Sequence, residues 1–264
     1  MSVAAVPATA PIAPMVWRQA AAEFRKLWRV PAFSATSLAL PVMFYAFFGD
    51  TNAHRVIPGT GVISGDYVMA SLGAYAVSNV MVFSFGIGVA NERGQKLDLL
   101  MRAAPLPALV YLVAKVLIAL LFGLLALLVL IGFARLTGSI DIGPTTVLVL
   151  TLRLLAGALP FVAIGFAFGY LAGPNSAVAV VNLIYLPMAF ASGIFIPAQL
   201  LPDWIAHISP YLPLYRYADL AWQTIGVKTG EDIWRDALYL TAYFVVFFAL
   251  ALWAYRRDAS RKFS

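Results

Sequence analysis

Side chains that could perform catalysis or bind a metal are scarce in this sequence. The 264 residues include 12 acidic residues, two histidines and no cysteine, which excludes disulfides and thiolate metal sites. His54 and His207 lie far apart in the chain, and neither an HExxH nor a GxSxG motif occurs. The run Gly226–Gly230 lacks the earlier glycine of a phosphate-binding GxxxxGKS/T loop. We therefore predict no catalytic site, no metal site and no cofactor bound by this chain.

Two basic residues lie near the ends of long apolar segments. Lys115 and Arg153 are candidates because a charge inside a membrane span is functional by default. Long basic side chains close to a span end can instead extend to the headgroup region, and we expect this second behaviour. The acidic residues all fall in loops or at the ends of apolar runs. That pattern argues against a carrier that couples transport to ions through buried carboxylates.

Aromatic residues in the apolar segments could line a path for a hydrophobic substrate, or form an outer gate. The candidates are Phe83, Phe85, Tyr185, Phe190 and Phe195. Contact with lipid or with the protein core is the alternative for each of them.

Small residues recur on one face of a predicted helix. Gly165, Gly169 and Gly173 have the spacing that lets two membrane helices approach closely. Packing within the chain and packing between two copies both fit this pattern.

These residues belong to a chain that is too apolar for a soluble protein. It is 62% hydrophobic and 11% charged, whereas soluble domains are about 45–50% apolar and about 25% charged. A spanning helix needs about 20 apolar residues, and only helices or closed barrels satisfy the backbone in lipid. We predict an all-α integral membrane protein with six transmembrane helices, at about 31–49, 67–90, 109–134, 145–171, 178–196 and 236–255.

The distribution of basic residues predicts the orientation of these spans. With the N-terminus inside, 12 of the 18 basic residues face the cytoplasm, as the positive-inside rule requires. They are Arg18, Arg25, Lys26, Arg29, Arg93, Lys96, Arg102, Lys115, Arg256, Arg257, Arg261 and Lys262. Both termini are therefore expected in the cytoplasm, with residues 1–14 as a disordered leader and 15–264 as one transmembrane domain. Orientation also explains the net charge of +6, so we expect no nucleic-acid partner.

Three segments outside the spans have a pattern of their own. In 15–29, Trp17, Phe24 and Trp28 recur at helical spacing among basic residues, which is typical of a helix in the membrane surface. In 91–107, Leu97, Leu100 and Met101 form one face of a short helix. The segment 197–232 is rich in Pro, Tyr and Trp, and we expect short re-entrant or interfacial helices there.

The 91–107 segment resembles ABC-2-type transporter permeases, the membrane-spanning subunits of bacterial ABC exporters. That family has an ERxxGTLExL-like run, a TPL-like turn and a basic residue that begins the third span. The corresponding residues here are Glu92, Arg93, Leu97, Leu100, Pro105, Leu106 and Lys115. The runs Ser192–Pro197, Leu201–Trp204 and Ser209–Pro213 are similar to its SGxxxP, LPxW and NPL motifs. Gln95–Lys96, Asp98 and Ser209 depart from the family pattern.

The resemblance implies a half-transporter that pairs with a second permease copy or a paralogue. ATP and magnesium then act through a separate ATP-binding subunit, so this chain is not itself an enzyme. The 15–29 segment matches the family's connecting helix, and the segment after the fifth span matches its re-entrant helices near the outer gate. The residues matching the helix that docks on the ATPase are Glu92, Arg93, Leu97, Asp98, Leu100, Met101 and Arg102. The implied activity is export of a drug, lipid or glycan across the inner membrane.

Two other functions remain open at the level of sequence. An ion- or proton-coupled carrier or channel would work without ATP. A membrane-embedded enzyme or assembly scaffold would need clustered titratable residues, for which the sequence gives no sign.

Overall fold

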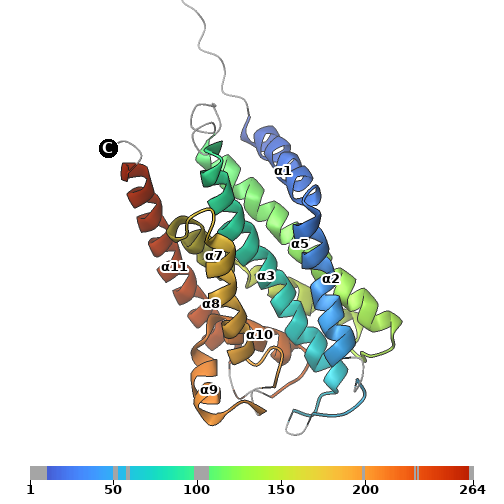
Figure 1. The fold of residues 1–264 in the computed structure, drawn as a ribbon. Coiled ribbons are helices and arrows are strands. Elements are labelled where there is room, and N and C mark those ends of the chain that lie inside the picture. The colour runs from blue at the N-terminus through green and yellow to red at the C-terminus, as the bar shows by residue number, and fades with distance from the viewer. Residues whose placement is uncertain are drawn as a thin grey trace, which may run out of the picture.

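The computed structural model describes residues 11–49, 53–57, 60–97, 107–197, 200–228, 230 and 232–261, and it is helical apart from short connections (Figure 1). One isolated antiparallel bridge joins Val56 to Ile63. The helices are α1 (Ile12–Trp28), α2 (Pro31–Phe48), α3 (Ser64–Gly94), α5 (Ala108–Leu136), α6 (Pro144–Ala156), α7 (Leu159–Leu171), α8 (Ala177–Ala191), α9 (Asp203–Ile208), the 3-10 turn η2 (Ser209–Tyr211), α10 (Pro213–Thr224) and α11 (Ile233–Arg261).

Prolines define where several helices begin. Pro31, Pro144 and Pro213 are the first residues of α2, α6 and α10, where the missing N–H is not needed. The 31 residues of α3 contain no proline, so the longest helix runs without interruption.

Helix α3 forms the centre of the molecule. It packs against α7, α5, α2, α8 and α10, and most of its residues are buried. A Cβ on Gly169 would lie 2.7 Å from the Phe85 carbonyl oxygen, and one on Gly165 would lie 2.8 Å from the Phe85 Cβ. These two glycines therefore allow α7 to approach α3 closely, which supports packing within the chain as the role of this series.

The chain is a multi-pass membrane protein, and the described helices do not by themselves decide the number of spans. Among the described residues, four helical stretches are long and apolar enough to cross a bilayer: Ser64–Gly94, Leu109–Leu136, Pro144–Leu171 and Ile233–Asp258. The number is five if the bent pair of α1 and α2 counts as one span. Helix α8 has 15 residues, or about 22 Å at about 1.5 Å per residue, against a hydrocarbon core of about 30 Å. Six spans therefore stays a prediction.

The predicted fourth span consists of two helices instead of one. Helix α6 ends at Ala156 and α7 begins at Leu159, with Gly157 and Ala158 between them. Pro160, at the second position of α7, cannot donate a backbone hydrogen bond to the preceding turn. The interruption therefore lies beside Gly157 and Pro160, two residue types that disfavour a continuous helix.

The N-terminal helix begins slightly earlier than the pattern indicated. Helix α1 starts at Ile12, with Pro14 in its first turn, where proline is tolerated. Its axis turns by 67° toward α2. Phe24 and Trp28 pack on Phe122 of α5 with ring centroids 5.6 and 6.5 Å apart, whereas Trp17 is 77% exposed. Residues 1–10 of the expected leader lie outside the described residues.

The two ends of the bundle have different structures. The end of α3 and the starts of α1 and α5 lie at the same end as the last turns of α11 (Figure 1). Helices α9 and α10 lie at the opposite end (Figure 1). Short helices thus do follow α8, in the segment where the sequence predicts them.

Candidate coupling site and substrate path

Glu92, in the last turns of α3, joins three helices through its carboxylate. Lys115 Nζ of α5 donates to Glu92 Oε1 at 2.6 Å, and the Tyr111 hydroxyl donates to Oε2. Lys26 of α1 donates to the same carboxylate and, at 3.2 Å, to Glu23. Glu92 is buried by these contacts. We call these five residues the Glu92 cluster.

The Glu92 cluster contains two acids and two lysines, so its charges balance. The Lys115 side chain is only 2% exposed, and the expectation that it extends to the headgroups is therefore wrong. Its ammonium group points to Glu92 inside the bundle and not to the surface. Removing one member of such a pair leaves a buried charge without compensation and costs about 3–5 kcal/mol.

Arg93, the next residue, joins α3 to two other helices. Its Nη1 donates to the carbonyl oxygens of Gly169 at 2.7 Å, Tyr170 at 3.2 Å and Ala172 at 3.3 Å. These carbonyls belong to the end of α7, where a helix leaves its last acceptors unpaired. Its Nη2 donates to Asp258 of α11. Arg93 therefore connects α3 with α7 and α11.

The chain leaves α3 immediately after these two anchors. Lys96 has φ of 57°, a left-handed conformation typical of the residue that ends a helix, and Leu97 follows in helical geometry. Asp98, Leu100, Met101 and Arg102, predicted to contact an ATPase, lie outside the described residues. Glu92 and Arg93 point into the bundle, so they can hold and move this segment but do not form its outer surface.

Most of the aromatic candidates form one cluster between α2, α3 and α8. Tyr185 packs on Phe83 at 5.9 Å and on Tyr75 at 5.8 Å between ring centroids. Phe195 contacts Tyr75 at 5.1 Å and Phe190 at 4.7 Å. Phe190 is 46% exposed. The cluster therefore extends from the core to the surface.

Phe85 does not join this cluster. Its ring is fully buried and packs on Phe166 of α7 at 4.7 Å. Its position on α3 faces the close contact with α7, which gives it a packing role.

A second polar cluster, at the α10 end, was not expected from the sequence. Arg216 Nη1 donates to Asp236 Oδ1 at 3.2 Å, and its guanidinium lies 4.3 Å from the ring centre of Tyr239. Gln223 Nε2 donates to Asp219 Oδ2 at 2.9 Å and to Asp236 Oδ2 at 2.8 Å. Arg216, Asp219 and Asp236 are at most 1% exposed. We call these five residues the Arg216 cluster.

A signal for the Arg216 cluster was present in the sequence. Positions 216, 219 and 223 lie on one face of a helix, and short helices were predicted in this segment, but no shared polar face was recognised among them. Two further hydrogen bonds join α10 to α6 and α3. Tyr217 donates to the Leu154 carbonyl oxygen at 2.5 Å, and Trp222 Nε1 donates to Ser71 Oγ at 2.8 Å. Burial raises the pKa of the Tyr217 hydroxyl well above its usual value, so the phenol remains a donor.

Long apolar helices around a buried central helix, with polar clusters near both ends, define a helical multi-pass membrane protein. Residues 33–253 match the family model described as ABC-2 family transporter protein, and the chain belongs to this family. It is 28% identical over 241 residues to the protein named "Putative transport permease YvfS" of Bacillus subtilis (strain 168), covering 91% of this chain and 97% of that protein. The chain is thus the membrane subunit of an ABC transporter, the partner of an ATP-binding subunit.

Proposed function

We propose that this chain is the permease of an ATP-driven exporter that moves an amphipathic or hydrophobic substrate, such as a drug, lipid or glycan, out of the cytoplasm. It works as a pair with a second copy or a paralogue. A separate subunit binds ATP and magnesium and docks on the segment that follows α3. The protein lies in the inner membrane with both termini in the cytoplasm.

The observation that carries this proposal is the pair Glu92–Arg93. Glu92 contacts α1 and α5, and Arg93 contacts α7 and α11. A displacement of the segment after α3 is therefore transmitted to four helices besides α3 itself. Such a displacement changes the equilibrium between inward- and outward-open states only if nucleotide binding favours one of them.

The aromatic cluster is the proposed substrate path or outer gate. Phe83, Tyr185, Phe190 and Phe195 connect buried α3 to the exposed side of α8, and Tyr185 is fixed by its hydroxyl, 2.9 Å from Ser78 Oγ. An aromatic surface suits a greasy substrate, because ring faces bind by burial of apolar area without a fixed polar pattern.

Co-expression with the ATP-binding subunit encoded nearest to this chain tests the proposal. The two proteins should co-purify, and Leu97→Asp with Leu100→Asp should break the association by placing charge on the docking face. Leu136→Asp is the matched control, because Leu136 is 89% exposed at the opposite end of α5. Failure of the two proteins to associate, with transport unchanged in the paired aspartate variant, would contradict the proposal.

One observation favours a second candidate, a proton-coupled carrier. Asp219 on α10 and Asp236 in the first turn of α11 are both fully buried. Vesicles containing this chain alone distinguish the two mechanisms, because a carrier would transport on a proton gradient without ATP.

A further inference from the structure

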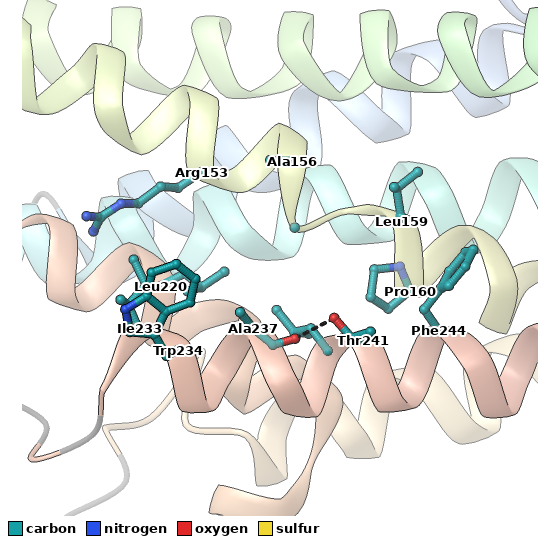
Figure 2. Close-up of a pocket in the computed structure, with 12 residues that line it drawn as sticks. Arg153, Ala156, Leu159, Pro160, Leu220, Ile233, Trp234, Ala237, Thr241 and Phe244 are labelled. Atoms are coloured by element: carbon teal, nitrogen blue, oxygen red, sulfur yellow. Dashed lines mark hydrogen bonds between the residues drawn. The ribbon is translucent and has the colours of Figure 1, made fainter.

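A cavity of about 430 Å³ lies between the α6–α7 interruption, α10 and α11 (Figure 2). Its walls are apolar side chains of these helices, apart from Arg153 and Thr241. The Thr241 hydroxyl donates to the Ala237 carbonyl oxygen at 2.7 Å, so it needs no ligand. The cavity lies beside the break between α6 and α7, where Gly157 and Pro160 line it.

A smaller, polar cavity of about 190 Å³ adjoins the first one through Arg153. Its lining residues are Thr145, Thr146, Val149, Arg153, Gln223 and Thr224. Arg153 alone lines both cavities. The two hollows together form one amphipathic site, with a polar compartment on one side of the guanidinium and an apolar one on the other.

The charge of Arg153 has no acidic counterpart in the described parts of the chain. Its Nη1 donates to Thr224 Oγ1 at 2.9 Å, and no salt bridge joins it to a described carboxylate. An arginine stays protonated in proteins, and its planar donors match the oxygens of a phosphate group. The site therefore favours an anionic group next to Arg153.

The length of the apolar cavity matches one leaflet of a bilayer. Arg153 and Trp234 lie at one end, and Pro160 and Phe244 lie at the other (Figure 2). Trp234 and Phe244 are separated along α11 by about 15 Å, at about 1.5 Å per residue, and half of the hydrocarbon core is about 15 Å. Trp234 is 78% exposed and Leu159 is 44% exposed, so the cavity opens to the side of the bundle where lipid lies.

We propose that this site binds an anionic phospholipid from the leaflet at the α10 end. The phosphate lies against Arg153 in the polar cavity, and one acyl chain fills the apolar cavity along α11. The site is distinct from the ATPase coupling segment and from the aromatic cluster, and its occupancy would fix the α6–α7 interruption against α11.

Fluorescence quenching of Trp234 by brominated lipids tests this proposal in the full chain reconstituted into phosphatidylcholine vesicles. The contribution of Trp234 is the difference between the wild type and Trp234→Phe. We expect brominated phosphatidylglycerol to quench it with an association constant about tenfold higher than brominated phosphatidylcholine, because phosphatidylglycerol keeps a net negative charge beside Arg153, whereas the choline ammonium of phosphatidylcholine compensates its phosphate. Equal quenching of Trp234 by the two lipids would overturn the proposal.

Variants test whether the preference for phosphatidylglycerol depends on Arg153. Arg153→Gln should abolish it, Arg153→Lys should keep most of it, and Ala237→Phe should weaken quenching by both lipids by filling the cavity. Arg135→Gln is the matched control, because Arg135 also lies in the last turn of a helix but lines neither cavity. A preference that survives in Arg153→Gln, or that Arg135→Gln also removes, contradicts the assignment. Soluble glycerol phosphate should not compete, and equal competition would indicate an anion site without a lipid.

Discussion

The Glu92 cluster and the Arg216 cluster are both buried, but they differ in charge balance and in what they connect. The first has two acids and two lysines from three helices, with Glu23 and Lys115 far apart in the chain. The second has Arg216 paired with Asp236 on the adjacent helix, with Gln223 joining Asp236 to Asp219. Asp219 Oδ1 lacks a hydrogen-bond partner among the described atoms. In the Glu92 cluster, neutralising a charged residue leaves a charge of the other sign unpaired. The Arg216 cluster has one acid more than it has cations, so one of its acids can be neutralised without leaving a cation unpaired.

The largest effect is expected where the only described cation of the Arg216 cluster is removed. Arg216→Met leaves Asp236 and Asp219 buried without a positive charge, which should cost about 3–5 kcal/mol of unfolding free energy. Thermal unfolding of the purified protein in detergent measures this loss. Arg135→Met is the control, since Arg135 is exposed. Equal losses in the two variants would show that Arg216 does not stabilise its cluster.

The Glu92 cluster should lose slightly less when its shared acid is neutralised. Glu92→Gln leaves Lys115 without its acidic partner, at a cost of about 3 kcal/mol, while Lys26 keeps Glu23. Glu23→Gln should cost less, because the Lys26 side chain is 40% exposed and water can solvate it. Adding Lys115→Met to Glu92→Gln should restore stability in a double-mutant cycle. Strictly additive losses would refute the ion pair as the source of the effect.

The smallest effect is expected at the excess acid. Asp219→Asn keeps an acceptor for Gln223 and removes one buried negative charge, so stability should change by at most about 1 kcal/mol, in either direction. The measurement is the same thermal unfolding curve. A loss as large as that of Glu92→Gln would mean that both clusters depend equally on every charged member.

The sequence predicts the helical membrane fold well, because runs of apolar residues and the positions of prolines are local properties. Helix α3 and the start of α6 follow directly from such signals. The sequence could not predict that Lys115 is buried, because its partner Glu92 approaches only when α3 packs on α5. The orientation predicted from the basic residues did place Lys26, Arg93 and Lys115 on the same side of the membrane, which is the signal from which the contacts could have been suspected.

The Arg216 cluster was missed for a different reason. Short helices were predicted in the segment 197–232 from its prolines and aromatic residues, but the partner Asp236 lies on another helix, so the polar contacts between α10 and α11 could not be foreseen. The break between α6 and α7 was not part of the prediction, which gave one span at 145–171. Pro160 disfavours a continuous helix there, but the cavity beside it is lined by α10 and α11 as well and so depends on contacts between distant segments.

Transmission of motion from the segment after α3 to the proposed outer gate can be tested directly. The chain has no cysteine, so Phe195→Cys provides a single labelling site in the aromatic cluster. In the complex with the ATP-binding subunit, a membrane-impermeant maleimide added from outside should react faster when a non-hydrolysable ATP analogue is bound. In the Arg93→Gln background the two subunits should still associate, but this acceleration should be lost. The same acceleration in Arg93→Gln as in the parent protein would contradict transmission through Arg93.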